Sequence, residues 1–235
     1  MKLNMTVTAL CLALLTAPLG SSAEEPSTSA SPTKAAKRTG TPKFTPTNLG
    51  TPSTRLGGAT RGGSDSIPRT EALVPEQSGQ TLEAQPVLYW FLSGPTKDRI
   101  DFAIVGVDPI NPVLETTLKG PFEPGIQRIR IADYDVELDR GVSYQWFVRV
   151  VPNPEQRLYD RVVGGGIERI EANDTLEAQL AAAHVGDAHY VLADAGIWYD
   201  ALDSLSVQIE AAPSDADLIA QRAALLEQVG LRNLN

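Results

Sequence analysis

The chain has 235 residues, of which 21% are charged, and its formal net charge at pH 7 is −9. The charge is uneven: residues 24–70 carry seven basic and three acidic side chains, and residues 71–235 carry 12 basic and 26 acidic ones. Binding to the phosphates of a nucleic acid requires a basic surface, and residues 71–235 are strongly acidic. We therefore expect no nucleic-acid partner.

The first 23 residues have the features of a secretory signal peptide. Lys2 supplies a positive charge, the run from Met5 to Leu15 is largely apolar, and Ala23 is a small residue at a plausible cleavage site. The run is shorter than the ~20 apolar residues that a spanning helix needs, and no later segment is apolar enough to span. We therefore predict a bacterial periplasmic or secreted protein with no stable membrane insertion after cleavage.

Cysteine usage restricts the chemistry of the exported chain. Cys11 is the only cysteine, and it lies within the predicted signal peptide. Without it the mature chain can form no disulfide, bind no metal through thiolates and use no cysteine nucleophile.

Residues 24–56 form a leader dominated by Ser, Thr, Pro, Ala, Gly and Lys. Such a composition buries too little apolar surface to offset the entropy of ordering, so we predict a disordered spacer. Its basic side chains could contact anionic lipid or glycan, but they are sparse, and a solvated tether is the favoured interpretation.

Residues 57–172 contain short segments of strand character separated by Pro, Gly and Asp turns. The predicted strands are 86–93, 99–105, 112–118, 126–131, 143–150, 158–163 and 167–171. Apolar and polar residues alternate in several of them, which is typical of an antiparallel sheet with one buried and one solvated face. We predict an immunoglobulin-like or fibronectin-like β-sandwich.

An acidic segment, "DYDVELD" at 133–139, would place four carboxylates on one face if it formed a strand. Closely spaced carboxylates can hold calcium, but the segment lacks the glycine and the spacing of a calcium loop. We favour a solvated strand face that discourages edge pairing.

Two glycine-rich segments, 57–64 and 164–169, are better interpreted as turns than as phosphate-binding loops. The first has no P-loop lysine, and the second lies between predicted strands. Arg61 in the first segment is a candidate for an ion pair that anchors the leader, and a candidate partner-binding residue.

Residues 173–235 form a predicted helical tail, so the fold class is α+β. Asn173 or Asp174 suits the N-cap of a first helix, and Ser214 that of the last helix, which Gly230 ends. One apolar stripe at helical spacing marks a helix between them: Trp198, Leu202, Leu205 and Ile209.

The segment "DAGIWYDALDSL" at 194–205 allows two interpretations. Aromatic rings beside carboxylates can bind a sugar or a cation, but Trp198 also begins the apolar stripe and would fill a helix seam. We favour the seam, with Asp200 and Asp203 facing outward as an acidic rim. Tyr199, Asp200 and Asp203 are therefore candidate partner-binding residues.

Five motifs occur in an order that resembles a bacterial secreted family, the domain of unknown function 928. They are "GGATRGG" (57–63) followed by "ALVP" (72–75), the aromatic strand "PVLYWFLSGP" (86–95), "GVSYQWFVRV" (141–150), "GGGIERIE" (164–171), and "AGIWYDALDSL" with a final "ALLEQVGL". The resemblance covers residues 57–231 and implies an extracytoplasmic protein without a known activity. Residues 188–229 also resemble a single tetratricopeptide-type unit, which would have to pack on the rest of the chain or on a partner.

No pattern of catalytic residues stands out. The two histidines, His184 and His189, belong to neither a Gly-x-Ser-x-Gly nor a His-Glu-x-x-His motif. We expect no enzyme and no cofactor, but an envelope protein that binds a protein partner through its tail or a sheet edge. The alternatives are a carbohydrate-binding module using exposed aromatic residues such as Tyr89 or Phe91, and a hydrolase acting on envelope glycans.

Overall fold

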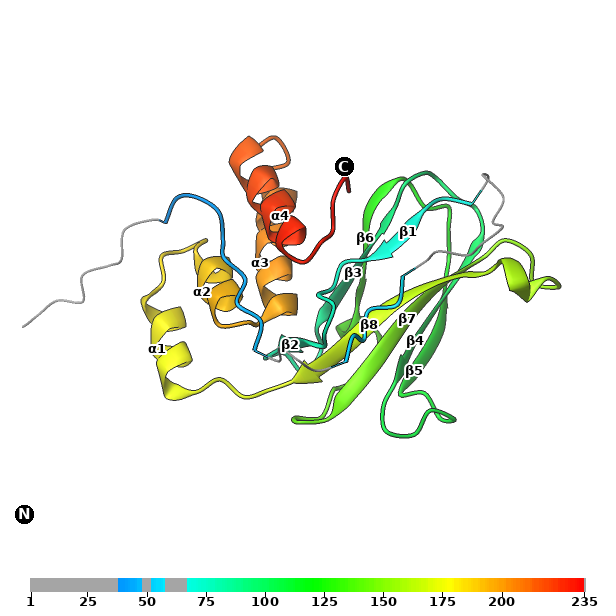
Figure 1. The fold of residues 1–235 in the computed structure, drawn as a ribbon, viewed down its shortest axis with the longest axis horizontal. Coiled ribbons are helices and arrows are strands. Elements are labelled where there is room, and N and C mark those ends of the chain that lie inside the picture. The colour runs from blue at the N-terminus through cyan, green and yellow to red at the C-terminus, as the bar shows by residue number, and fades with distance from the viewer. Residues whose placement is uncertain (1–37, 48–51, 58–66, 235) are drawn as a thin grey trace, which may run out of the picture. The chain divides into compact units, whose positions relative to one another are not determined.

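The computed structural model describes residues 38–47, 52–57 and 67–234 (Figure 1). The described residues all belong to one compact unit, in which the strands and the helices share a hydrophobic core. Within the described residues, eight strands precede four α-helices, so the fold is α+β as the sequence predicts. The predicted signal peptide and Arg61 lie outside the described residues.

The larger sheet has five strands in the order β2-β8-β7-β4-β5. Their bounds are Gly79–Thr81 for β2, Arg161–Arg169 for β8, Ser143–Val151 for β7, Arg99–Val105 for β4 and Leu114–Leu118 for β5. Only the β2–β8 pair is parallel. The predicted alternation is confirmed in β4 and β7, because every second side chain, including Phe102 and Trp146, is buried.

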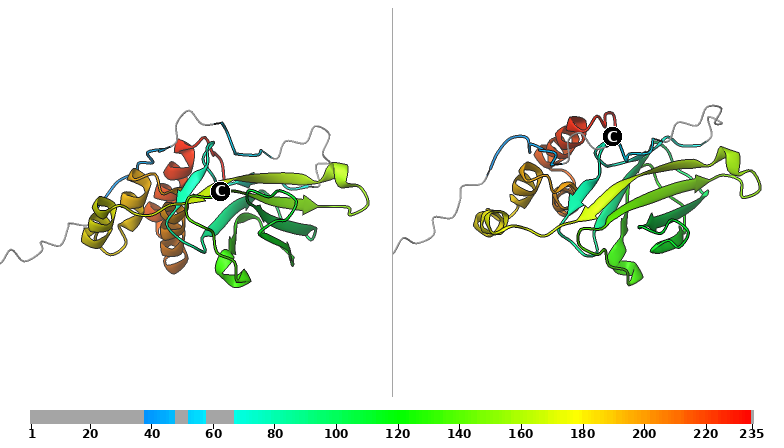
Figure 2. Two further views of the ribbon diagram at one scale, coloured as in Figure 1. Left: turned by 90° about the horizontal axis from the view of Figure 1, so that it is seen from below. Right: turned by 60° about the horizontal axis from the view of Figure 1, so that its bottom comes forward.

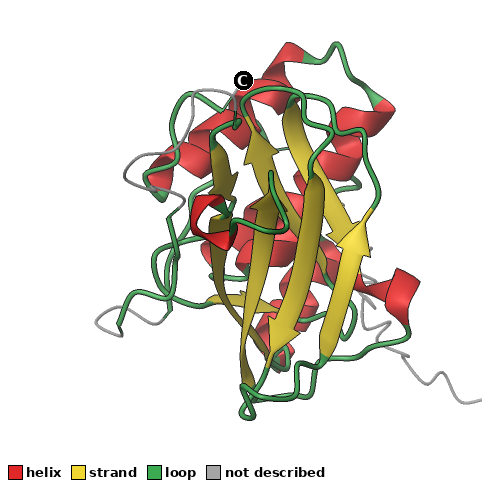
Figure 3. Cartoon of the chain, turned by 90° about the vertical axis from the view of Figure 1, so that its right-hand side faces the viewer, coloured by secondary structure: helices red, strands yellow, loops and turns green. Residues whose placement is uncertain are grey.

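The smaller sheet is antiparallel, with the order β1-β3-β6. Its strands are Thr70–Ala72, Val87–Leu92 and Gly125–Arg130. All residues of β3 from Leu88 onward are buried, so the expected solvated face is wrong for this strand. The reason is a cover of helices, which Figure 3 shows behind the strands when the larger sheet faces the viewer.

The glycine triplet Gly164–Gly166 is not a turn, and the two strands predicted around it are one continuous strand, β8. The triplet lets other segments come very close to the strand. A Cβ at Gly165 would meet Val74, and one at Gly166 would meet Ser78 and Thr54. The glycines therefore allow segments outside the sheet to pack closely against β8.

The acidic segment 133–139 does not form the predicted strand. A 3₁₀-helix covers Ile131–Tyr134, and Asp135 then takes a left-handed conformation with φ 53°. The four carboxylates are exposed, and no group of three or more His, Cys, Asp or Glu in the described ranges is arranged to hold a metal ion.

The four α-helices follow β8 along the chain. They are α1 Asp174–Ala182, α2 Ala188–Asp194, α3 Trp198–Ala211 and α4 Ala216–Gln228. The Asn173 side chain caps α1, but Asp215 rather than Ser214 caps α4, because its carboxylate accepts from two backbone N–H groups of the first turn. None of the helices in the described residues is long and apolar enough to cross a membrane.

Part of the predicted disordered leader packs against the folded unit. The backbone N–H of Thr45 donates to the carbonyl of Ala193 at 3.0 Å, and the Phe44 ring meets Trp198 edge-on at 4.9 Å between centroids. Leu56 forms an antiparallel bridge with Gly164 of β8. The prediction of disorder is therefore wrong for 38–47 and 52–56, while 24–37 and 48–51 lie outside the described residues.

Candidate functional site

Trp198 and Tyr199 lie at the junction where α3 meets both sheets. The indole N–H of Trp198 donates to the carbonyl of Leu73 at 2.9 Å. The Tyr199 hydroxyl accepts from the indole N–H of Trp146 at 2.9 Å and donates to the Gly166 carbonyl at 2.8 Å. Both side chains are buried, so the predicted packing role is confirmed, but the seam joins α3 to the sheets rather than to another helix. Tyr199 is not accessible to a partner.

Asp200 and Asp203 do not face outward as predicted. The Asp200 carboxylate accepts from the hydroxyl of Thr81 and from the backbone N–H of Leu82, the latter at 2.8 Å. The Tyr89 hydroxyl donates to Asp203 at 2.6 Å. The two carboxylates are covered because the loop after β2 and strand β3 pack on this side of α3 and supply hydrogen-bond donors.

A cavity of about 360 Å³ is lined by Tyr199, Asp200 and Asp203 of α3, together with Glu83, Ala188 and other residues of α2 and the β2–β3 loop. The structure thus brings three of the four predicted site residues, Tyr199, Asp200 and Asp203, to one place. Burial raises the pKa of Asp200 to about 6, because desolvation of its carboxylate outweighs the two hydrogen bonds that lower the pKa.

The raised pKa makes a prediction for Asp200→Asn. In the unfolded chain this carboxyl titrates near 4, so between about pH 4 and pH 6 only the folded state holds its proton, and the wild type loses stability as pH rises. The free energy of unfolding of Asp200→Asn, minus that of the wild type, should therefore rise by about 2–3 kcal/mol across this window. Urea denaturation at several pH values measures the difference, and a flat difference would contradict the assignment.

The β7–β8 connection presents apolar side chains to solvent. A 3₁₀-helix, Arg157–Tyr159, forms its tip, where Leu158 is 92% and Tyr159 47% exposed. Both views in Figure 2 show this connection at the end of the sheet away from the helices.

Ion pairs hold this tip in place. The guanidinium of Arg157 contacts Asp160 at 2.7 Å, and that of Arg149 approaches the same carboxylate at 3.9 Å. Arg157 also lies 3.8 Å from Asp101 of β4, which pairs with Arg99 at 2.7 Å. The Asp160 side chain is buried, so two arginines converge on a desolvated carboxylate directly after Tyr159.

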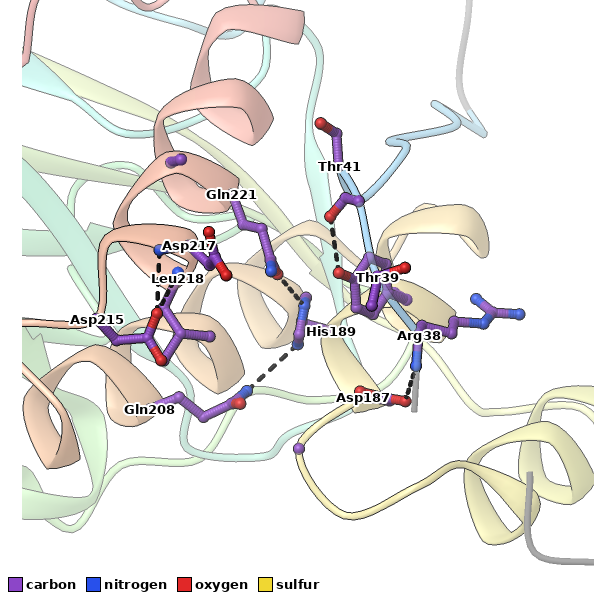
Figure 4. Close-up of a pocket in the computed structure, with 14 residues that line it drawn as sticks. Arg38, Thr39, Thr41, Asp187, His189, Gln208, Asp215, Asp217, Leu218 and Gln221 are labelled. Carbon is purple, nitrogen blue, oxygen red and sulfur yellow. Dashed lines mark hydrogen bonds between the residues drawn. The ribbon is translucent and has the colours of Figure 1, made fainter. Parts of the chain in front are cut away.

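A polar cavity of about 400 Å³ lies between residues 38–41 and helices α2, α3 and α4 (Figure 4). The backbone N–H of Arg38 donates to the Asp187 carboxylate at 2.6 Å, and the Tyr190 hydroxyl donates to the Gly40 carbonyl at 2.7 Å. These bonds hold the leader segment over the cavity. Sequence reasoning missed the cavity, because it treated the leader as disordered.

His189 in this cavity has partners on both ring nitrogens. Its Nε2 lies 2.9 Å from the Gln221 amide oxygen, and its Nδ1 lies 3.2 Å from the Gln208 amide nitrogen. A neutral imidazole with its proton on Nε2 satisfies both bonds, and burial lowers the pKa of His189, which favours that neutral form. The geometry suits a structural histidine rather than a proton acceptor in a reaction.

A family model described as Domain of Unknown Function (DUF928) matches residues 56–235. The chain belongs to the DUF928 family. No curated protein and no solved structure matches it.

The motifs that carry the DUF928 resemblance meet at the junction around α3. Leu73 of "ALVP" accepts from Trp198, and Trp146 of the "SYQW" strand donates to Tyr199, which in turn donates to Gly166 of the glycine triplet. These DUF928 motifs therefore describe how the sheets and the helices are joined in this chain, and they do not by themselves point to a reaction.

Proposed function

We propose that this protein is an exported, non-enzymatic module of the bacterial envelope that docks a protein partner through the tip of its β7–β8 connection. The observation that carries the proposal is the exposure of Leu158 and Tyr159 on a turn fixed by ion pairs. Export follows from the predicted signal peptide, residues 1–23, as part of the same proposal.

Three features of the tip support a binding role. A connecting loop tolerates polar residues, so the fold itself does not require leucine at a position that is 92% exposed. Tyrosine is enriched among the residues that contribute most to binding energy at protein interfaces. The salt bridges of Asp160 restrict the tip before binding, which reduces the entropy that association costs.

A site-specific photo-cross-linker tests the proposal in cells of the protein's own host. A cross-linker at Leu158 should give one defined adduct with an envelope protein, whereas one at Glu177, an exposed residue of α1, should not. Tyr159→Asp in the Leu158-labelled protein should abolish the adduct without changing the thermal unfolding midpoint.

Equal labelling from positions 158 and 177 would contradict docking at the tip. The same conclusion would follow from an adduct that persists in Tyr159→Asp. A wild-type protein that gives no adduct from position 158 would refute the proposal.

A carbohydrate-binding module is the second candidate, but not on the aromatic strand that the sequence predicted. Tyr89 and Phe91 are buried, so they present no stacking surface. The cavity of Figure 4 favours this candidate instead, because its carboxylate, amide and hydroxyl side chains match the donors and acceptors of a sugar. Calorimetric titration with cell-wall glycan fragments tests it, and the absence of binding heat for every fragment would remove it.

Two finer assignments of the fold belong to the same proposal. The antiparallel three-stranded sheet and the five-stranded sheet, antiparallel except for its β2–β8 pair, are compatible with the immunoglobulin-like sandwich that the sequence predicts. Helices α2, α3 and α4 are compatible with one tetratricopeptide-type unit that packs on the sheets.

A further inference from the structure

A second cavity of about 400 Å³ lies between α4 and the chain that follows it, residues 231–234, with Ile126 of β6 on its wall. The wall combines apolar side chains with the polar side chains of Arg222, Asn233 and the paired residues Glu227 and Arg232. The lining residues that matter for the argument are Ile126, Ile219, Arg222, Ala223, Leu226 and Leu231.

No side-chain hydrogen bond or ion pair joins Arg222 on this wall to another described residue, although its charge is attracted at longer range by Glu210, which already pairs with Arg128, and by Tyr89. Neighbouring arginines are paired: Arg128 with Glu210, and Arg232 with Glu227 at 3.2 Å. Arg222 is also half-buried, and desolvation lowers its pKa. Charges withdrawn from water are normally paired, because an unpaired one destabilises the fold.

We propose that this cavity binds a carboxylate carried on a short aliphatic chain. The planar guanidinium of Arg222 suits bidentate recognition of a carboxylate, and such charge-assisted hydrogen bonds are stronger than neutral ones. The side chains of Ile126, Ile219 and Leu226 offer apolar surface to the aliphatic part. The site lies on α4, so it is separate from the β7–β8 tip and goes beyond the proposed function.

The protein itself offers a matched pair of variants. Arg222→Gln removes the charge at the cavity, and Arg130→Gln removes the charge of an exposed arginine on β6 that does not line it. We expect wild type and Arg130→Gln to bind octanoate with similar affinity in calorimetric titration. Arg222→Gln should bind it about tenfold more weakly or not at all, the loss expected from removing a charge-assisted hydrogen bond.

Two further measurements separate recognition from a structural role. Octanamide, which has the same chain but no charge, should bind wild type no better than octanoate binds Arg222→Gln. The thermal unfolding midpoint of Arg222→Gln should equal or exceed that of wild type, because the variant loses an unpaired charge.

Three outcomes would overturn the inference. Wild type that shows no saturable binding of octanoate has no such site. Equal affinity of wild type and Arg222→Gln, or of octanoate and octanamide, would remove Arg222 from recognition. A clear fall in the unfolding midpoint of Arg222→Gln would assign this arginine to the fold instead.

Discussion

Trp198→Ala should lower the free energy of unfolding by about 3–5 kcal/mol, the usual cost of removing a fully buried aromatic ring. The Trp198 ring is fully buried and packs edge-on against Phe44 of the leader segment. The substitution also leaves the Leu73 carbonyl without the indole N–H that donates to it. Urea denaturation of the protein measures the loss.

Leu158→Ala provides the control, because it removes an apolar side chain of similar class from a position that is 92% exposed. Its effect on the free energy of unfolding should stay within about 0.5 kcal/mol. If Trp198→Ala were as mild as Leu158→Ala, the junction around α3 would not hold the strands and the helices together. Trp198→Ala should also make residues 38–47 more sensitive to proteolysis, since Phe44 loses the ring on which it rests.

The sequence predicts β4 and β7 well because their signal is local, whereas the equally long β8 is predicted as two strands because of its glycine triplet. Alternation in 99–105 gives the bounds of β4, and β7 at Ser143–Val151 is one residue longer than predicted. Strands β1 and β2 escaped prediction, because three residues are too few to show a period. The pairing of β2 with β8 also joins residues 79–81 to 167–169, and no local pattern reports such a distant partner.

Helical periodicity identified the buried stripe of α3 but misplaced its carboxylates. The pattern places Asp200 and Asp203 off the apolar stripe, and it therefore predicts that both carboxylates are exposed to solvent. Their hydrogen-bond donors, Thr81, Leu82 and Tyr89, precede them by more than 100 residues. A polar helix face that is covered by other segments has the same sequence pattern as one exposed to solvent. The burial of Asp200 and Asp203 could therefore not be predicted from the sequence.

The docking of the leader could not be predicted for a different reason. Its composition, averaged over residues 24–56, is that of a disordered segment, and one aromatic residue does not change the average. Phe44 nevertheless finds a complementary surface at Trp198, and Gly196 with φ +81° lets the leader pass where a side chain would meet Thr45 and Thr47. Docking here depends on fit to a distant surface rather than on composition.

Gly164→Ala tests whether residues 161–169 are one continuous strand or two strands around a turn. In β8, a Cβ at Gly164 would overlap the backbone carbonyl oxygen of Trp146 in the neighbouring strand β7. Backbone of a paired strand cannot move aside as a flexible side chain does, so we expect a loss of about 3 kcal/mol or more in the free energy of unfolding.

Gly57→Ala is the matched control, because a Cβ at Gly57 would meet no atom within 4 Å. Its effect should stay within about 0.5 kcal/mol. A turn at 164–166, as the sequence predicted, would leave room for a methyl group and make the two variants equally stable. A large difference between them would instead mean that position 164 is glycine because the backbone of β7 approaches β8 too closely for a side chain.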